Sequence, residues 1–394
     1  MRSPRIPGVR FLHAPGPTRI PDEVLDAMHR QSIDLADPRL EVWIEDCERG
    51  MRQVVDTVSG EVYLYAANGH GAWEVAIVNL LAEADLVFIP STGHFSESWA
   101  LQAEALDRRV LRTPWKPGYP IDPNEVESVL RKDRKGEIRA VFVVQTDTST
   151  GISSDLQAIR QAIDASGHPA LYVVDVVSSL AAAPFGMDRM GVNLVVGGSQ
   201  KGLMLPPGMG FVVVDERAHQ ASCDNPSPKY YWDWTNRTGT HAYRKFCGTP
   251  PLQMLMGLRA ALDLLLQEGM DAVLQRHQRL ANAVYAAVEA WSSAGAVDFF
   301  CREPQARSVS VTAVTLEGHD PEHLRSVARE RFQVAMSGGL GPLAGRVFRI
   351  GHLGDMNEPT ILGALAGIEA AMLHLGVPVG RQALPRAIDT LLAA

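Results

Sequence analysis

Short apolar runs alternate with amphipathic helical stretches between residues 60 and 215. Strands covered by helices on both faces read as continuous apolar runs, and Ala140–Gln145, which begins Ala-Val-Phe-Val-Val, has this form. The other predicted strands of this part are Val62–Ala66, Leu86–Pro90, Leu171–Val177, Asn193–Val196 and Phe211–Val214. The alternation is typical of stacked β-α-β units and predicts an α/β fold with a mostly parallel sheet.

The pattern changes in the last third of the chain. A long helical stretch from about Leu252 to Trp291 contains the helix breaker Glu268-Gly269-Met270. Beyond it the sequence predicts strands Val309–Thr315, Gln333–Met336 and Val347–Gly351, and helices Pro321–Arg331 and Pro359–Leu375. We therefore expect a large domain over residues 1–262, with an N-terminal arm, and a smaller α+β domain over residues 263–394.

Composition narrows the classes of function. The 394 residues are 46% apolar and 21% charged, which is enough to bury a core without disulfides. The formal charge is −8 and no run of five basic residues occurs, so nucleic acid is not an expected partner. Because Cys47, Cys223, Cys247 and Cys301 lie far apart, neither a disulfide framework nor a metal site is expected.

The chain also shows no sign of a membrane segment. Its basic first residues precede no apolar signal region, and no window of 18 uncharged apolar residues follows. We therefore expect a cytoplasmic protein with no membrane partner.

A lysine and an aspartate follow two neighbouring predicted strands. Lys201 stands in the run Gly-Gly-Ser-Gln-Lys-Gly after one strand, and Asp175 ends the apolar run that starts at Leu171. In an open α/β sheet the carboxyl ends of neighbouring strands face one crevice. A Schiff-base lysine and an aspartate that protonates a pyridine nitrogen are what a pyridoxal phosphate enzyme requires, so the pair predicts that cofactor. Taken alone, Lys201 also fits a surface loop, and Asp175 fits a helix cap or a Mg²⁺ ligand.

Small residues surround the start of a predicted helix in Ala67-Asn68-Gly69-His70-Gly71-Ala72-Trp73-Glu74. Backbone N–H groups at such a start point along the helix axis, where the helix dipole favours an anion such as a phosphate ester. The segment matches neither the dinucleotide-binding motif nor the P-loop. We expect His70 to cap or pack beside the phosphate, while a catalytic base or a metal ligand stays an alternative.

An arginine, Arg349, interrupts the apolar strand Val347–Gly351. Burying a guanidinium is costly unless a carboxylate pairs with it, and its two-pronged donor edge suits an amino-acid or keto-acid carboxylate. An internal salt bridge is the alternative for this residue. Its place in the second domain, opposite the predicted crevice, favours a substrate clamp.

Together these motifs resemble those of the class V aminotransferases, pyridoxal phosphate enzymes of fold type I, and within them the serine–glyoxylate and alanine–glyoxylate aminotransferase family. The resemblance covers nearly the whole chain. Its segments are His13–Thr18, Gly69–Glu74, Thr148–Gly151, Val174–Ser179, Gly198–Pro206, Thr249–Pro251 and Phe348–His352. It implies a large domain with a seven-stranded, mostly parallel sheet and a smaller α+β C-terminal domain.

The resemblance implies a role for each position that it covers. Lys201 would hold the cofactor as a Schiff base and move the substrate proton, while Asp175 would pair with the pyridine nitrogen. Arg349 would bind the substrate carboxylate. These three residues would form the chemical centre of the site.

The remaining positions would hold the cofactor in place. Those that would bind its phosphate are Asn68, Gly69, His70, Gln200 and, from the neighbouring subunit, Thr249. Those that would enclose its ring are Phe95 on one face, Val177 on the other and Ser149 at the edge. A site shared in this way implies a homodimer.

The implied activity is a ping-pong transamination between small amino acids and 2-oxo acids. L-Serine would give its amino group and glyoxylate would take it, so that hydroxypyruvate and glycine are formed. Alanine–glyoxylate and pyridoxamine–pyruvate aminotransferases are alternatives, although the latter typically have Glu and an extra Arg where this chain has Asn68 and Leu340. A desulfurase is disfavoured because Gln200, and not His, precedes the lysine.

The chain departs from the family in two places. Phe246-Cys247-Gly248 stands where the family often has a tyrosine, with Tyr243 a few residues back, and Asn68 stands where a small hydroxyl residue or Gly is usual. A catalytically silent cofactor-binding homologue is a further alternative. The presence of the lysine, the aspartate and the arginine weighs against it.

Overall fold

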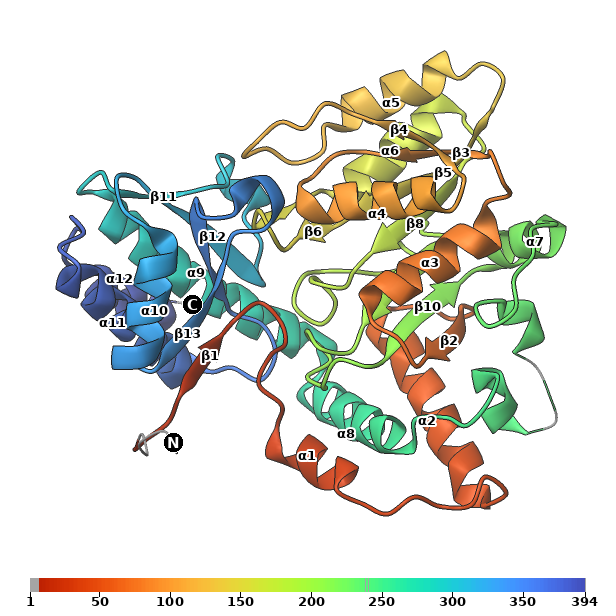
Figure 1. Cartoon of the computed structure of the whole chain (residues 1–394), viewed down its shortest axis with the longest axis horizontal. Coiled ribbons are helices and arrows are strands. Elements are labelled where there is room, and N and C mark those ends of the chain that lie inside the picture. The colour runs from red at the N-terminus through yellow and green to blue at the C-terminus, as the bar shows by residue number, and fades with distance from the viewer. Residues whose placement is uncertain (1–6, 238, 240, 394) are drawn as a thin grey trace.

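The computed structural model describes residues 7–237, 239 and 241–393, and its larger sheet has seven strands in the order β2-β10-β9-β8-β5-β3-β4 (Figure 1). Their bounds are β2 (Glu61–Tyr65), β3 (Leu86–Ile89), β4 (Arg109–Arg112), β5 (Ile138–Val144), β8 (Leu171–Asp175), β9 (Leu194–Gly198) and β10 (Gly210–Val214). β10 runs antiparallel to β2 and β9, and the other neighbours pair in parallel. The predicted α/β fold with a mostly parallel seven-stranded sheet is confirmed.

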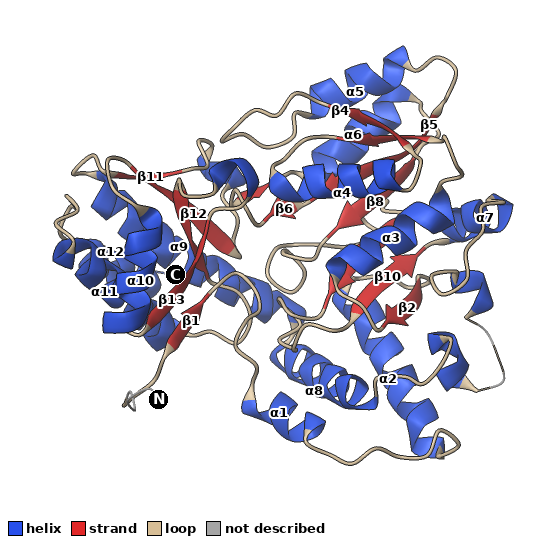
Figure 2. Cartoon of the chain, in the orientation of Figure 1, coloured by secondary structure: helices blue, strands red, loops and turns tan. Residues whose placement is uncertain are grey.

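Helices cover both faces of this sheet (Figure 2). They are α2 (Pro38–Val54), α3 (Gly69–Leu80), α4 (His94–Ala105), α5 (Pro123–Lys132), α6 (Leu156–Ser166), α7 (Glu216–Asp224) and α8 (Leu252–Glu268). Alternate residues of β5 divide between two apolar clusters. Phe142 packs with α3 and α4, whereas Val141 and Val143 pack with α2, α5, α6 and α8. This double burial explains why the strand sequence is apolar at every position from Ala140 to Val144.

Each predicted strand of this sheet lies within two residues of an observed one. β4 has no counterpart among the predictions. It pairs with β3 at the edge of the sheet, and its sequence Arg-Val-Leu-Arg carries charged residues at both ends. Edge strands commonly have this character, so no continuous apolar run marks β4 in the sequence.

The smaller sheet has five strands in the order β1-β13-β14-β12-β11. Their bounds are β1 (Phe11–His13), β11 (Val297–Phe299), β12 (Val311–Leu316), β13 (Val334–Gly338) and β14 (Val347–Gly351). The helices of this part are α9 (Met270–Ser292), α10 (Pro321–Arg331), α11 (Glu358–His374) and α12 (Ala383–Ala393). α10 and β14 have the predicted bounds, and the predicted breaker is Gly269, which separates α8 from α9 with a φ of +87°.

The N-terminal arm joins the smaller sheet. β1 pairs in parallel with β13, so that Phe11 faces Val334 and His13 faces Met336. The chain then runs to α1 (Asp22–Met28), which packs against α8 (Figure 1). Because α8 runs through residue 262, the division of the chain at that position stays a prediction.

Short elements complete the described chain. They are the hairpin strands β6 (Thr146–Asp147) and β7 (Ile152–Ser153), and the 3₁₀ helices η1 (Trp234–Asn236), η2 (Ala242–Phe246), η3 (Pro304–Ala306) and η4 (Gly341–Leu343). In the described ranges, no helix is long and apolar enough to cross a membrane. The four cysteines are free, and no group of three His, Cys, Asp or Glu side chains among the described residues could hold a metal ion.

Three histidines, His13, His277 and His352, are buried where the arm, α9 and the smaller sheet meet. His352 Nε2 lies 2.9 Å from the hydroxyl of Thr312. His277 Nε2 accepts from the N–H of Gly354 at 3.0 Å, so its other ring nitrogen carries the proton and the ring is neutral. Burial lowers the pKa of His277 to about 4 and that of His352 to about 3.

Acid is therefore expected to destabilise the fold below about pH 6.5, where unfolded histidines bind a proton but His277 and His352 do not. Their stabilising contribution is complete above that pH and is lost as the pH falls towards the two lowered pKa values. His277→Gln removes one such group. The unfolding free energy of this variant should therefore fall less steeply as the pH decreases, by about 1.4 kcal/mol per pH unit between about pH 6 and 4.5. Urea unfolding at several pH values measures the slope, and an unchanged slope would contradict this role.

Candidate active site

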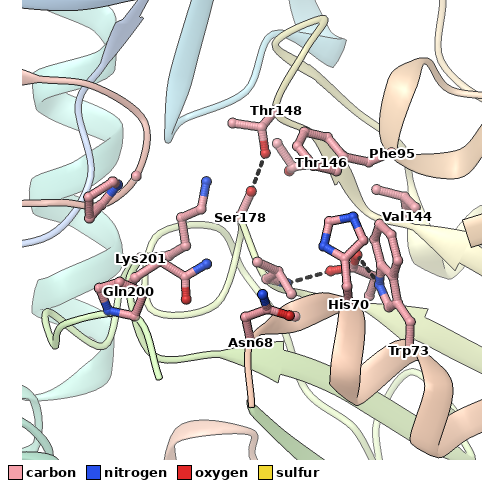
Figure 3. Close-up of a pocket in the computed structure, with 16 residues that line it drawn as sticks. Asn68, His70, Trp73, Phe95, Val144, Thr146, Thr148, Ser178, Gln200 and Lys201 are labelled. Carbon is pink, nitrogen blue, oxygen red and sulfur yellow. Dashed lines mark hydrogen bonds between the residues drawn. The ribbon is translucent and has the colours of Figure 1, made fainter. Parts of the chain in front are cut away.

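A cavity of about 280 Å³ lies at the carboxyl ends of β5, β8 and β9. These strands are parallel neighbours, so the residues that follow them meet at one edge of the sheet (Figure 3). The lining residues are Gly16, Pro17, Asn68, Gly69, His70, Trp73, Phe95, Val144, Thr146, Thr148, Asp175, Val177, Ser178, Gln200, Lys201 and Pro207. The predicted lysine and aspartate thus share one cavity with most of the predicted cofactor-binding residues.

Lys201 enters the cavity from the loop after β9 (Figure 3). It is 8% exposed, and its Nζ donates to the carbonyl oxygen of Pro15 at 2.5 Å. Burial, followed by the positive charge of Arg349, lowers the pKa of Lys201 to about 7 against the opposing effect of Asp175. Near neutral pH a large share of this lysine is the free amine, the form that attacks a carbonyl carbon or accepts a proton.

Asp175 is the last residue of β8 and is buried. Its Oδ1 accepts from the backbone N–H of Val177 at 2.6 Å, and its Oδ2 accepts from the indole N–H of Trp73 at 2.8 Å. Burial raises the pKa of Asp175 to about 7 in spite of these donors. A carboxyl group that two donors hold in an apolar wall is suited to pair with a buried cation. Trp73 is not among the predicted site residues, because it lies 102 positions from Asp175 in the sequence and only the fold brings the two together.

The amino end of α3 faces the cavity with three of the residues predicted to bind phosphate. Asn68 caps this helix by accepting from the N–H of Gly71 at 3.2 Å, and Gly69 and His70 begin its first turn. A Cβ on Gly69 would lie 3.2 Å from a methyl group of Val177. The glycine therefore keeps the helix end open, and the helix dipole favours an anion there.

Gln200 brings an unsatisfied polar atom to the same cavity. Its Oε1 is buried and has no hydrogen-bond partner in the described part of the chain. A Cβ on Gly198 would lie 3.1 Å from this oxygen. Because a half-turn of the amide exchanges its oxygen and nitrogen, Gln200 can offer a donor or an acceptor to a ligand.

Phe95 and Val177, the two residues predicted to enclose a ring, both line the cavity. Phe95 lies in the first turn of α4, and its ring meets that of Trp73 edge-on with centroids 6.3 Å apart. Val177 follows Asp175 by two residues and donates its N–H to that carboxyl group. Their contact with opposite faces of a bound ring stays a prediction.

Arg349 lies in the middle of β14, 5% exposed and beside the cavity wall. Its Nε donates to the carbonyl of Gly338 and its Nη1 to that of Thr148, both at 2.7 Å. Among the described residues it forms no ion pair, so an internal salt bridge is not supported, and its Nη2 has no acceptor there. Burial lowers its pKa to about 10, which leaves it charged at neutral pH. The free edge of this guanidinium suits a carboxylate.

Two other predicted residues do not line the cavity. Ser149 is buried, donates its hydroxyl to Asp147 and accepts from the N–H of His94 at 3.2 Å, while its neighbour Thr148 lines the wall. Thr249 is exposed between η2 and α8. The roles predicted for these two residues stay predictions.

Asp147 is a buried carboxylate that is not among the predicted site residues. Its Oδ2 accepts from the hydroxyl of Thr92 at 3.1 Å and the N–H of Phe95 at 3.0 Å, and its Oδ1 accepts from the N–H of Ser149 at 2.9 Å. It therefore holds the start of α4, and with it Phe95, next to the cavity. In the sequence an aspartate within Thr-Asp-Thr-Ser-Thr is indistinguishable from an ordinary turn residue.

Comparison with known proteins agrees with this geometry. The family described as Aminotransferase class-V matches residues 10–343. The chain is 39% identical to the serine–glyoxylate aminotransferase of Methylorubrum extorquens, with 96% of this chain and 95% of that protein covered. It is 38% identical to the L-aspartate–glyoxylate aminotransferase of Paracoccus denitrificans, with 93% and 91% covered. The solved ureidoglycine–glyoxylate aminotransferase of Bacillus subtilis superposes with a TM-score of 0.89 at 26% identity, over 99% of both chains.

The chain belongs to the class-V aminotransferase family, and it is a pyridoxal phosphate-dependent aminotransferase. The predicted family and cofactor are confirmed. The residues of the cavity fit this cofactor: an amine with a lowered pKa for its aldehyde, a buried carboxyl for its ring nitrogen, and the open end of α3 for its phosphate. The unsatisfied amide of Gln200 lies in the same wall.

Asp147→Asn is expected to weaken both stability and cofactor retention. Asparagine keeps one acceptor oxygen but turns an N–H₂ group towards the other pair of donors, which costs about 1–3 kcal/mol. The start of α4 and Phe95 should then shift, so that pyridoxal phosphate dissociates faster during dialysis. The absorption band of the bound cofactor measures the amount that remains. Asp155→Asn is the matched control, since Asp155 also accepts from two backbone N–H groups, but neither belongs to a residue that lines the cavity. Equal cofactor retention in the two variants would contradict this role of Asp147.

Proposed function

We propose that this aminotransferase transfers the amino group of L-serine to glyoxylate, forming hydroxypyruvate and glycine. The names of all three relatives described above include glyoxylate, which supports it as the amino acceptor here. The other substrate in those names differs, being serine, aspartate or ureidoglycine. The donor therefore has to be inferred from the cavity.

The cavity wall supports a small donor with a single carboxylate. Lys201 is the one Lys or Arg among the described residues that line the cavity, and Arg349 lies beside the cavity wall. Arg349 suits the carboxylate that every amino-acid donor carries, so a second carboxylate, as in aspartate, would have no further Lys or Arg among the described residues that line the cavity. Thr146, Thr148 and Ser178 offer hydroxyl groups that can bond the hydroxyl of serine (Figure 3). This set of lining residues carries the choice of serine.

Lys201 is the group that we propose moves the proton. Pyridoxal phosphate, when bound, supplies an electron sink for the bonds at the donor's Cα. Nζ of Lys201, a large share of which is the free amine near neutral pH, takes up the Cα proton and later releases it. Asp175, held by Trp73 and the N–H of Val177, binds the protonated ring nitrogen.

The other predicted residues hold the cofactor and the substrate in this proposal. Arg349 binds the substrate carboxylate through its free edge. Asn68, Gly69, His70 and Gln200 would hold the phosphate at the amino end of α3. Phe95 and Val177 would enclose the ring, and Ser149 would lie at its edge.

The donor is tested with the holoenzyme, glyoxylate and one of L-serine, L-alanine, L-aspartate or pyridoxamine, by measuring the glycine formed. We expect kcat/KM for L-serine to exceed that for L-aspartate by about 100-fold, because an unpaired carboxylate in the cavity is costly. L-Alanine lacks one hydrogen-bonding hydroxyl and should be about tenfold poorer than L-serine.

Two variants control this measurement. Arg349→Lys keeps the charge but loses the two-pronged donor edge, so it should raise KM for every amino-acid donor about tenfold with little change in kcat. Lys201→Ala should abolish turnover. Aspartate equal to or better than serine would overturn the proposed donor, alanine or pyridoxamine as the best donor would favour one of the alternatives, and no glycine from any donor would overturn the acceptor.

We propose in addition that the protein is a cytoplasmic homodimer with shared active sites. Thr249 is exposed and does not line the cavity of its own chain, which supports a contact with the phosphate in a second copy. The cytoplasmic location is proposed from the sequence. A shared site makes each subunit dependent on its partner for cofactor binding.

Sharing is tested by sedimentation and by mixing variants. The wild-type protein should sediment at about twice the 42.9 kDa mass of the chain. Lys201→Ala should be inactive and Thr249→Ala should bind pyridoxal phosphate about tenfold more weakly, through the loss of one hydrogen bond to a charged group. In mixed dimers one site regains both Lys201 and Thr249, so activity at limiting cofactor should return. An active monomer, or no recovery on mixing, would contradict a shared site.

A further inference from the structure

The N-terminal arm, residues 13–18, crosses from the smaller sheet to the loop of Lys201 (Figure 1). At its first residue, Nδ1 of His13 donates to the carbonyl of Gly351, at the end of β14, at 2.9 Å. At its last residue, the hydroxyl of Thr18 donates to the backbone carbonyl of Lys201 at 3.0 Å. The arm is therefore anchored at both ends.

Between these anchors the arm approaches the side chain of Lys201 closely. Nζ donates to the carbonyl oxygen of Pro15 at 2.5 Å. Gly16 has a φ of +136°, and a Cβ there would lie 2.5–2.6 Å from Cε, Cδ and Nζ of Lys201. On the other side of the arm, a Cβ on Gly351 would lie 2.6 Å from the carbonyl group of Ala14. The contact thus depends on one glycine within the arm, Gly16, and on another in the strand next to it, Gly351.

A backbone carbonyl suits an amino group that changes its charge. It accepts a hydrogen bond from a neutral amine and a stronger one from an ammonium group, and it has no proton to give. A carboxylate in the same place would hold the ammonium form and raise the pKa of the lysine. Within the described part of the chain, the carbonyl of Pro15 is the acceptor that Nζ has.

We propose that the carbonyl oxygen of Pro15 is the resting acceptor of the Lys201 amino group whenever this group is not bonded to the cofactor. A lysine that leaves and rejoins its cofactor in every half-reaction needs a defined position in between. The arm is then a positioning element of the active site. Because the arm is anchored to β14, the free lysine is held relative to the strand that carries Arg349.

The test uses the cofactor-free protein and does not depend on turnover. Lysines are acylated with acetic anhydride between about pH 5 and 9, and the modified fraction of Lys201 is measured by mass spectrometry of its peptide. Thr18→Val removes the hydroxyl that anchors the arm, whereas Thr18→Ser keeps it. Gly351→Ala displaces the arm from the other side through the backbone of Ala14, without adding an atom beside Lys201.

Loss of a hydrogen bond to the charged form should lower the labelling midpoint of Lys201 by about one pH unit, and so raise labelling below the midpoint about tenfold. We expect this in Thr18→Val and Gly351→Ala, and wild-type labelling in Thr18→Ser. The exposed Lys132, on α5, should label equally in all samples and serves as the internal control.

Unchanged labelling of Lys201 in folded Thr18→Val and Gly351→Ala would overturn the proposal. If these variants do not fold, crystal structures of the wild-type protein with and without pyridoxal phosphate decide it. Nζ should lie within about 3.2 Å of the Pro15 oxygen without the cofactor and leave it when the cofactor is bound. An Nζ that lies away from Pro15 in the cofactor-free crystal would overturn the proposal equally.

Discussion

The burial of Lys201 and Asp175 in one cavity is the constraint on which the rest of the site depends. Each side chain loses the water that would stabilise its charged form, so the pKa of the amine falls to about 7 and that of the carboxyl rises to about 7. The neighbouring polar groups are then few and specific, with Trp73 donating to the carboxyl and Pro15 accepting from the amine. An amine whose pKa lies near neutrality takes up and releases a proton at little cost, which is what the proton transfer proposed for Lys201 requires.

The two sheets contribute different parts of this site. The carboxyl edge of the larger sheet brings Asp175 and Lys201 together because β8 and β9 are parallel neighbours. The smaller sheet contributes Arg349, whose Nη1 bonds the carbonyl of Thr148 in the cavity wall. Asp147 favours the charged form of Arg349 without forming an ion pair with it, so the guanidinium keeps a free edge that suits a carboxylate. A direct salt bridge would have used that edge.

Apolar periodicity was sufficient to predict most of the larger sheet, because a strand buried on both faces has to be apolar at successive positions. The same logic failed for β4, whose edge position leaves charged residues at both of its ends. Lys201 and Asp175 could be paired from the sequence, since strand order in a parallel sheet brings residues at strand ends to one crevice. Arg349 could be found because a guanidinium in an apolar strand requires a partner.

The sequence by itself thus determined the fold class and the family, and it predicted the groups that we propose carry the chemistry. Only the tertiary structure decided which residues support these groups. Trp73 donates to Asp175, Asp147 accepts from the N–H of Phe95, and the N-terminal arm bonds both the end of β14 and the backbone of Lys201. It also decided that β1 belongs to the smaller sheet. Periodicity reports how each segment is buried, whereas these contacts join segments far apart in the sequence, and their partners are set by packing.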